Sequence, residues 1–243
     1  MNEMYALVTG ASRGVGKSIA LALAREGAHV FINSHASYPE LKEVQTAIET
    51  EGKGTSTLLP GDVSDPTEVA AMFDEIDRHC DGLNVLVNNA GIAYSGLLME
   101  MSDASWQKII DTDLSSVFYC CRSALPKMIS KGQGKIINIS SIWGREGASC
   151  EAAYSAAKAG VDGLTKALAK EVAASNIQVN ALSLGVIDTS MNGNLDEEEK
   201  EALRQQIPAD RFGTTEEIAR MVVELVHAPS YLTGQVIGID GGF

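Results

Sequence analysis

The sequence predicts an α/β domain built on a doubly wound parallel sheet of seven strands, with helices on both faces. Two observations lead to this prediction. Short apolar runs alternate with amphipathic stretches along the whole chain, and no Pro- or Ser-rich linker divides its 243 residues. Apolar strands that alternate with helices form a parallel sheet, because each helix returns the chain to the same edge. We therefore expect 1–243 to form a single domain.

Each predicted strand is an apolar run that ends at a turn signal. The first is closed by Thr9 and Gly10, and the third ends at Gly61 and Asp62. The expected strands are 5–8, 29–33, 57–59, 83–87, 135–139, 177–181 and 236–239.

The predicted helices occupy the intervals between these strands. Asp65 followed by Pro66 is typical of a capping residue and a first helical turn. The expected helices are 18–25, 39–50, one that begins at 65–66, two pieces within 102–130, 152–174, an acidic one that contains 196–200, and 214–226.

Composition excludes several classes of protein. The net charge of −13 and the lack of a long Lys/Arg run disfavour nucleic-acid and anionic lipid partners. We expect no membrane association and a cytoplasmic protein, because no targeting segment or long apolar stretch is visible. The four cysteines lack metal-ligand spacing, so we expect no metal site and buried, reduced thiols at Cys80, Cys120, Cys121 and Cys150.

A glycine-rich turn joins the first strand to the first helix. It reads Thr9-Gly10-Ala11-Ser12-Arg13-Gly14-Val15-Gly16. Glycines allow a sharp turn and a close approach of backbone N–H groups to a phosphate, which the helix N-terminus also favours. In this position the turn indicates a dinucleotide-binding, Rossmann-type domain.

Further motifs follow in order. Asn88-Asn89-Ala90-Gly91 comes after the fourth strand, and Ser141 precedes Tyr154-Ser155-Ala156-Ala157-Lys158 by thirteen residues. With the spacing T-G-x-x-x-G-x-G of the turn, the chain resembles the short-chain dehydrogenase/reductase family over essentially its whole length. The resemblance implies a cofactor half at about 1–135, a catalytic half at about 136–243, a flexible lid at about 188–207 and a homotetramer.

The residues of the last motif suit carbonyl chemistry. Tyr154 and Lys158 are four apart on a predicted helix and so share one face. A nearby ammonium lowers the pKa of a phenol, and Ser141 at a strand end can hydrogen-bond a carbonyl or alcohol. We expect these three residues to polarise a carbonyl and deliver a proton while nicotinamide delivers hydride.

Two positions depart from the family pattern. Asp113 stands where the family usually has a catalytic Asn, whose backbone carbonyl is thought to hold a relay water. Asp113 still offers that carbonyl, so we include it in the catalytic set, although a purely local cap is an equal alternative. Leu184 precedes Gly185 where the family usually has Pro, which makes the loop less rigid.

The cofactor prediction depends on the second strand. That strand ends at Asn33 without the acidic residue that would bind a ribose 2′-hydroxyl, and Arg13 can clamp a 2′-phosphate with help from His35. We therefore expect NADP(H) in preference to NAD(H). The resemblance gives the expected cofactor contacts as Gly10, Ser12, Arg13, Gly14, Val15, Gly16, Asn33, His35, Asp62, Val63, Asn89, Ala90, Gly91, Tyr154, Lys158, Gly185, Ile187 and Thr189.

The substrate is expected to be a ketone that is reduced to a secondary alcohol. Its pocket is predicted to contain Tyr94, Ile142, Trp143 and Glu151 beside Ser141. Length and the T-G-A-S-R-G start are similar to those of bacterial 3-oxoacyl-[acyl-carrier-protein] reductases, which dock an acidic carrier protein. Such a surface could include Lys127, Lys131 and Lys135, but Ser175 and Asn176 stand where those reductases usually carry Arg.

Two alternatives remain open. The stretches 141–144, 147–151, 188–192 and 233–236 resemble elongation factor P 5-aminopentanone reductases, whose substrate carries an ammonium that Glu146 or Glu151 could bind. The simpler explanation of Glu151 is a favourable place in the first turn of its helix. The other alternative is a dinucleotide-sensing protein without turnover.

Overall fold

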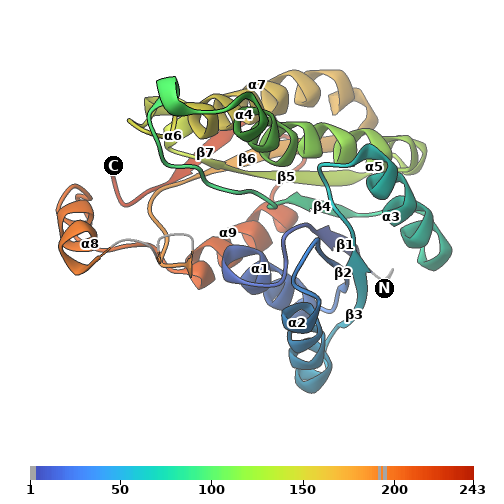
Figure 1. Ribbon diagram of the computed structural model, residues 1–243. Helices are drawn as coiled ribbons and strands as arrows, with labels where there is room; N and C mark the ends of the chain where they lie inside the picture. Colours follow the sequence, from blue (N-terminus) through green and yellow to red (C-terminus); the bar gives the residue numbers. More distant parts are fainter. Residues whose placement is uncertain (1–3, 191–192, 194–195) are drawn as a thin grey trace.

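A computed structural model describes residues 4–190, 193 and 196–243. Its strands form one parallel sheet in the order β3-β2-β1-β4-β5-β6-β7 (Figure 1). The strands are β1 (Tyr5–Val8), β2 (His29–Ser34), β3 (Thr55–Pro60), β4 (Val85–Asn88), β5 (Gly134–Ser141), β6 (Ile177–Leu184) and β7 (Val236–Ile239). The predicted fold class and all seven predicted strands are confirmed.

Helices lie on both faces of the sheet. Figure 1 shows α1, α2 and α9 on one face and α3, α4, α5 and α7 on the other. The helices are α1 (Gly14–Arg25), α2 (Tyr38–Glu51), α3 (Pro66–His79), α4 (Asp103–Ile110), α5 (Ser116–Lys131), α6 (Trp143–Glu146), α7 (Ala152–Val172), α8 (Glu197–Arg204) and α9 (Thr215–His227). Short 3₁₀ turns lie at Leu98–Glu100 and Ala173–Ser175.

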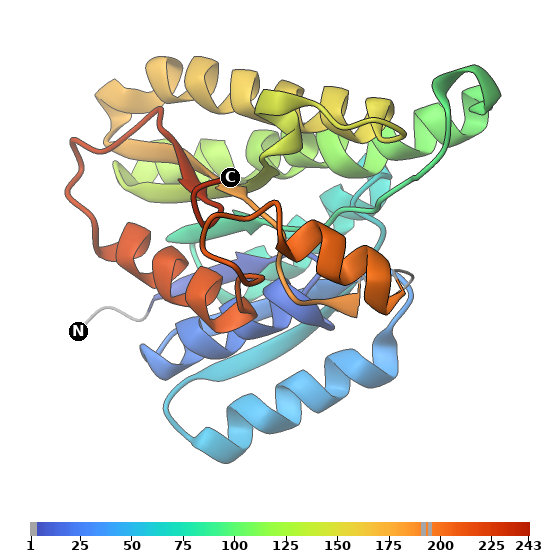
Figure 2. The same cartoon turned by 90° about the vertical axis from the view of Figure 1, so that its left-hand side faces the viewer.

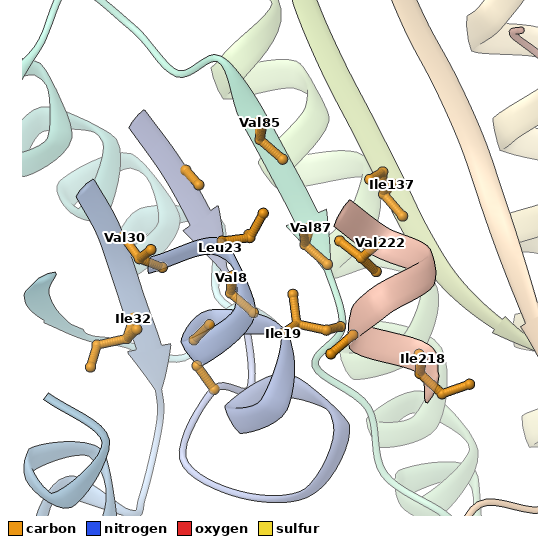
Figure 3. Close-up of a cluster of buried hydrophobic side chains, with 14 of the residues drawn as sticks. Val8, Ile19, Leu23, Val30, Ile32, Val85, Val87, Ile137, Ile218 and Val222 are labelled. Carbon is orange, nitrogen blue, oxygen red and sulfur yellow. The ribbon is translucent and has the colours of Figure 1, made fainter. Parts of the chain in front are cut away.

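The core consists of one apolar layer on each face. On the first face, Ile19 and Leu23 of α1 and Val222 of α9 pack against strand residues such as Val8 and Val87 (Figure 3). Most of these side chains have no exposed surface, and burying each one contributes about 1.5–3 kcal/mol. The sheet that carries the site is therefore a rigid platform.

The predicted capping of α3 is confirmed. The Asp65 carboxylate accepts hydrogen bonds from the backbone N–H groups of Thr67 and Glu68, and Pro66 occupies the first helical position. Thr214 caps α9 in the same way through Glu217 N–H. Both caps satisfy N–H groups that a helix start leaves without partners.

Besides small shifts at the ends of strands and helices, the structure differs from the prediction in three places. Helix α1 begins at Gly14, inside the glycine-rich turn, rather than at 18. The helical region 102–130 is continuous, because a π-helical segment, Asp111–Ser115, joins α4 to α5. The four-residue helix α6 follows β5 and has no counterpart in the predicted elements.

The segment after β6 departs from the main body. Ile187 pairs with Gly213 as an isolated parallel bridge, and α8 stands away from both helix layers (Figures 1 and 2). This segment contains the predicted lid at 188–207, of which Met191, Asn192, Asn194 and Leu195 lie outside the described residues.

Candidate active site

The predicted site residues gather at the carboxyl edge of the sheet. The glycine-rich turn follows β1, Asn89 follows β4, Ser141 ends β5, and Gly185 follows β6. Because the sheet is entirely parallel, these positions share one edge, which is where ligands bind in open α/β sheets. The chain order reverses between β1 and β4, so the crevice lies there.

The glycine-rich turn is packed too closely for side chains. A Cβ atom on Gly16 would lie 2.2 Å from the Gly10 carbonyl oxygen, and Gly10 itself has a φ of 64°. Asn89 Nδ2 donates to the carbonyl oxygens of Thr9, at 2.9 Å, and of Gly10, at 3.2 Å. The amides of Asn89 and Ala90 both donate to Thr9 Oγ1. Asn89 therefore fixes the turn that the sequence assigns to the cofactor.

The start of α1 suits an anionic ligand. Arg13 is the N-cap residue but makes no capping hydrogen bond, in contrast to the caps of α3 and α9. The first N–H groups of α1 consequently have no capping side chain. They adjoin the tight turn at Gly10 and Gly16, where a Cβ atom would have no room. Thr189 lies across from this point, since a Cβ on Gly14 would be 3.6 Å from its Cγ2. These residues fit a dinucleotide pyrophosphate.

The end of β2 presents hydroxyl and imidazole groups. Ser34 Oγ lies 3.4 Å from Ser12 Oγ, and His35 Nδ1 lies 3.6 Å from Asp62 Oδ2. Asn33 is buried, and its Nδ2 donates to the carbonyl oxygens of Leu59 and Gly61. Its amide group therefore holds β3 and the following turn.

The loop after β3 is built around Asp62. Its Oδ1 accepts from both the amide and the hydroxyl of Ser64, and these bonds lower the pKa of the carboxyl against the effect of burial. The Val63 side chain packs in the core of the second face.

Tyr154, Lys158 and Ser141 meet as the sequence predicts. Lys158 Nζ lies 5.3 Å from the centre of the Tyr154 ring and donates to the Ile139 carbonyl oxygen at 3.2 Å. Ser141 lies close enough to Tyr154 for its hydroxyl to lower the pKa of the phenol. Burial raises the pKa of the Tyr154 phenol, and the lowering by Lys158 that the sequence predicts acts against it without reversing it.

Asp113 enters the site through its side chain. It has no exposed surface, its Oδ1 accepts from Ile92 N–H at 2.9 Å, and its Oδ2 lies 3.3 Å from Lys158 Nζ. Burial by itself would lower the pKa of Lys158, but the Asp113 carboxylate and Tyr154 raise it above its usual value. Burial raises the pKa of Asp113, and the Lys158 ammonium acts against that rise without reversing it. Gly91 leaves room for this pair, because a Cβ there would lie 2.8 Å from Asp113 Oδ2.

The loop after β6 borders the same site. The residues that follow β7 pass close to Gly185, where a Cβ atom would lie only 2.6 Å from Asp240 Cα. Leu184, which replaces the family proline, is buried, and its carbonyl oxygen accepts from Ile142 N–H.

The four predicted substrate residues differ in their surroundings. Ile142 is only 1% exposed and belongs to the interior, whereas Trp143, Tyr94 and Glu151 are half-buried. Tyr94 packs against the cluster around Ala153 and Ala157. Burial raises the pKa of Glu151, and no hydrogen bond or ion pair links its carboxylate to the rest of the described chain.

The three lysines considered for carrier-protein docking lie at the opposite end of the sheet. Lys135 is the second residue of β5, whereas Ser141 is the last. Lys127 pairs with Asp77, Lys131 Nζ donates to the Gly82 carbonyl oxygen, and Lys135 Nζ donates to that of Ala228. The expectation that they flank the pocket is wrong, because the amino and carboxyl ends of a parallel strand lie at opposite edges.

Sequence reasoning missed two features near the site. Phe243 packs edge-to-face on Trp143, and Asp162 lies buried one turn beyond Lys158 on α7. Both depend on contacts that no motif marks. Elsewhere, a cavity of about 250 Å³ between α9 and the end of β7 includes Ile187, Arg211 and Asp240 but none of the catalytic set.

Among the described residues there is neither a candidate membrane span nor a candidate metal cluster. None of the helices within residues 4–190 and 196–243 is long and apolar enough to cross a membrane. No cluster of three or more His, Cys, Asp or Glu side chains among the described residues is arranged to hold a metal.

The fold and the grouping of Ser141, Tyr154 and Lys158 are typical of a dinucleotide-dependent oxidoreductase. Residues 10–243 match the family model described as "Enoyl-(Acyl carrier protein) reductase". The chain belongs to the short-chain dehydrogenase/reductase family, and it is an oxidoreductase of the class that acts on CH–OH and C=O groups. Family membership implies a nicotinamide cofactor.

The similar proteins cover almost the whole chain. The 3-oxoacyl-[acyl-carrier-protein] reductase FabG of Staphylococcus aureus (strain Mu50) is 44% identical over 238 residues, which is 98% of this chain and 96% of that protein. The enzyme of the same name from Vibrio cholerae is 40% identical with the same coverage. A crystal structure from Agrobacterium tumefaciens, described as a candidate gluconate dehydrogenase, superimposes with a TM-score of 0.94 at 36% identity, over 98% of this chain and 95% of that one.

Proposed function

We propose that this protein is an NADPH-dependent reductase of 3-oxoacyl groups carried by acyl carrier protein. The observation that carries the proposal is the meeting of Ser141, Tyr154 and Lys158 at the carboxyl edge of the sheet. It is supported by the reductases of that name at 40–44% identity over nearly the full length.

The chain's own groups account for the proton side of the reaction. When bound, the cofactor supplies hydride to the carbonyl carbon. The Ser141 hydroxyl hydrogen-bonds the carbonyl oxygen and orients it, and the Tyr154 phenol transfers its proton to that oxygen, which yields the secondary alcohol. Lys158 stabilises the resulting phenolate and holds the cofactor ribose.

The preference for NADPH is part of the proposal. Strand β2 ends without an acidic residue of its own, the Ser34 hydroxyl lies 3.4 Å from that of Ser12, and the exposed Arg13 follows Ser12 in the chain. His35 stands at the rim of the same place.

We propose a homotetramer and a lid at 188–207 on the same family grounds. Large apolar side chains such as Met99, Trp106, Phe118 and Tyr231 are exposed on this protomer, which is consistent with association. Light scattering of the purified protein measures the assembly directly, and a monomer would exclude the tetramer.

A second candidate function is reduction of the 5-aminopentanone group on elongation factor P. It is favoured by Glu151, whose half-buried carboxylate is free to bind an ammonium near Tyr154. The distance of Lys127, Lys131 and Lys135 from the site weakens the case for an acidic carrier protein.

Initial rates of NADPH oxidation distinguish the candidates. The wild-type protein is assayed on acetoacetyl-carrier protein and on elongation factor P that bears the ketone, with Tyr154→Phe as the blank. Preference for the carrier-protein substrate supports the first function, and preference for the other supports the second. No Tyr154-dependent turnover on any ketone would leave the sensing role.

A further inference from the structure

The Asp113 carboxylate has a single counter-ion. Its Oδ1 accepts from Ile92 N–H at 2.9 Å, and its Oδ2 has no hydrogen-bond partner of standard geometry in the described chain. Only Lys158 Nζ, 3.3 Å from Oδ2, balances its charge. A fully buried carboxylate is costly unless such an ammonium stays beside it.

The π-helical segment places Asp113 where its side chain can make this contact. An α-helix that ran unbroken from α4 into α5 would place 113 differently, because a π-turn adds one residue to the spacing. Here Asp113 faces the interior while its neighbours Asp111 and Thr112 are only partly buried. The segment thus places a charge beside a catalytic residue.

The ammonium of Lys158 must serve more than one anion. It has three N–H donors, of which one points to the Ile139 carbonyl oxygen, and its nitrogen lies 3.3 Å from Asp113 Oδ2. When Tyr154 ionises, the same single ammonium faces two negative groups. With a neutral residue at 113 it would face only the phenolate.

Other charges around Tyr154 do not cancel Asp113. From α7, Glu151 and Asp162 contribute negative charge, and Lys166 acts on Asp162. From α6, Arg145 lies between Asp162 and Asp240 and is paired with Glu146. Asp162 Oδ1 has no hydrogen-bond partner in the described chain, and the charge of Asp162 also acts on Lys158, although more weakly than that of Asp113.

We propose that Asp113 is a positioning residue that fixes Lys158 as its counter-ion and keeps Tyr154 protonated across neutral pH, as the proton donor that ketone reduction needs. The proposal rests on the proposed ketone chemistry. In reduction the Tyr154 O–H bond breaks and its proton joins the carbonyl oxygen as hydride reaches the carbon. Oxidation needs the phenolate to take that proton back, and the Asp113 charge opposes formation of the phenolate.

Asp113→Asn tests the proposal because it removes the charge and keeps the acceptor for Ile92 N–H. In the protein without substrate, the near-ultraviolet absorbance change of Tyr154 is isolated by subtracting the titration of Tyr154→Phe. We expect Tyr154 to titrate about one pH unit lower in Asp113→Asn. The pH profile of kcat/KM for alcohol oxidation, which requires the phenolate in the free enzyme, should shift downward by the same amount.

Asp162→Asn is the matched control. It removes a buried carboxylate one turn from Lys158 that does not contact the ammonium, so its shift should be less than about a third as large. Asp113→Ser serves as a second neutral variant if the Asn protein folds poorly.

The outcomes separate two kinds of failure. An unchanged Tyr154 titration in Asp113→Asn would mean that Asp113 is already neutral, and an upward shift would mean that Lys158 loses its proton; either result overturns the proposal. A downward shift without turnover on any ketone would leave the role of Asp113 intact and remove the proposed function.

Discussion

The aromatic ring of Phe243, the last residue of the chain, packs edge-to-face on Trp143, with ring centroids 5.4 Å apart and an interplanar angle of 88°. Trp143 begins α6, and its backbone N–H donates to Ser141 Oγ at 3.2 Å. Residues near the end of the chain also contact the segment that follows the predicted lid, 188–207, because Ala209 N–H donates to the Gly241 carbonyl oxygen. Residues 241–243 therefore link that segment to the start of α6 beside Ser141.

Removing the Phe243 ring should loosen the start of α6 beside Ser141. An edge-to-face pair contributes about 0.5–1.5 kcal/mol, so we expect Phe243→Ala to raise KM about two- to tenfold with little change in the thermal midpoint. Steady-state kinetics on the preferred ketone measure the effect. Tyr231→Ala, which removes a 99% exposed ring, is the control, and an equal effect there would contradict a specific role for Phe243.

Substitutions of Gly16 and of Gly163 by Ala form a second matched test. A Cβ on Gly16 would collide with the Gly10 carbonyl oxygen at 2.2 Å, whereas one on Gly163 of α7 would meet nothing within 4 Å. We expect Gly16→Ala to abolish cofactor binding, and Gly163→Ala to stabilise the protein by about 0.5–1 kcal/mol. Nucleotide fluorescence titration and chemical unfolding measure the two outcomes. Retained affinity in Gly16→Ala would show that the turn is not the cofactor site.

The sequence was sufficient for the parts of the fold that local patterns determine. Apolar runs located each strand, Asp65 marked the start of α3, and the spacing of Tyr154 and Lys158 placed them on one helix face. The parallel sheet then brought Ser141 and the glycine-rich turn to the same edge.

Contacts between distant segments were not predictable in this way. The role of the Asp113 side chain depends on a π-helical segment, which has the same helical periodicity in sequence as its neighbours. The Phe243 contact depends on how the chain returns after β7. The direction of the strand was enough to predict that Lys135 lies far from the site, because it stands near the start of the strand that Ser141 ends.

Arg13 should determine the choice of nicotinamide cofactor. It is exposed and follows Ser12, whose hydroxyl lies 3.4 Å from that of Ser34, and its guanidinium can form paired, charge-assisted bonds to a 2′-phosphate. We expect Arg13→Ala to raise the Kd for NADPH about tenfold or more and to change the Kd for NADH less than about twofold. Isothermal titration calorimetry measures both. Equal losses for the two nucleotides would mean that Arg13 binds the shared pyrophosphate.

Cys120 and Cys121 should be unreactive in the folded protein. Both thiols are buried, and burial raises the pKa of Cys121 to about 12 and that of Cys120 further still. Since the thiolate is the nucleophile, a thiol reagent should label only the half-buried Cys80 and Cys150 until the chain unfolds. Mass spectrometry of labelled peptides, with and without denaturant, measures this. Labelling of Cys121 under native conditions would show that α5 opens locally.

Glu151 distinguishes the two candidate substrates. Its carboxylate is half-buried and unpaired within the described chain, so an ammonium on the substrate would be its partner. We expect Glu151→Gln to raise KM for an amino ketone about tenfold and KM for a neutral ketone less than about twofold. Because burial raises the pKa of Glu151, wild-type KM for the amino ketone should also increase as pH falls through that pKa. Glu146→Gln is the control, since Glu146 already pairs with Arg145. Equal effects on both ketones would mean that Glu151 only supports the start of α7, and the carrier-protein function would stand alone.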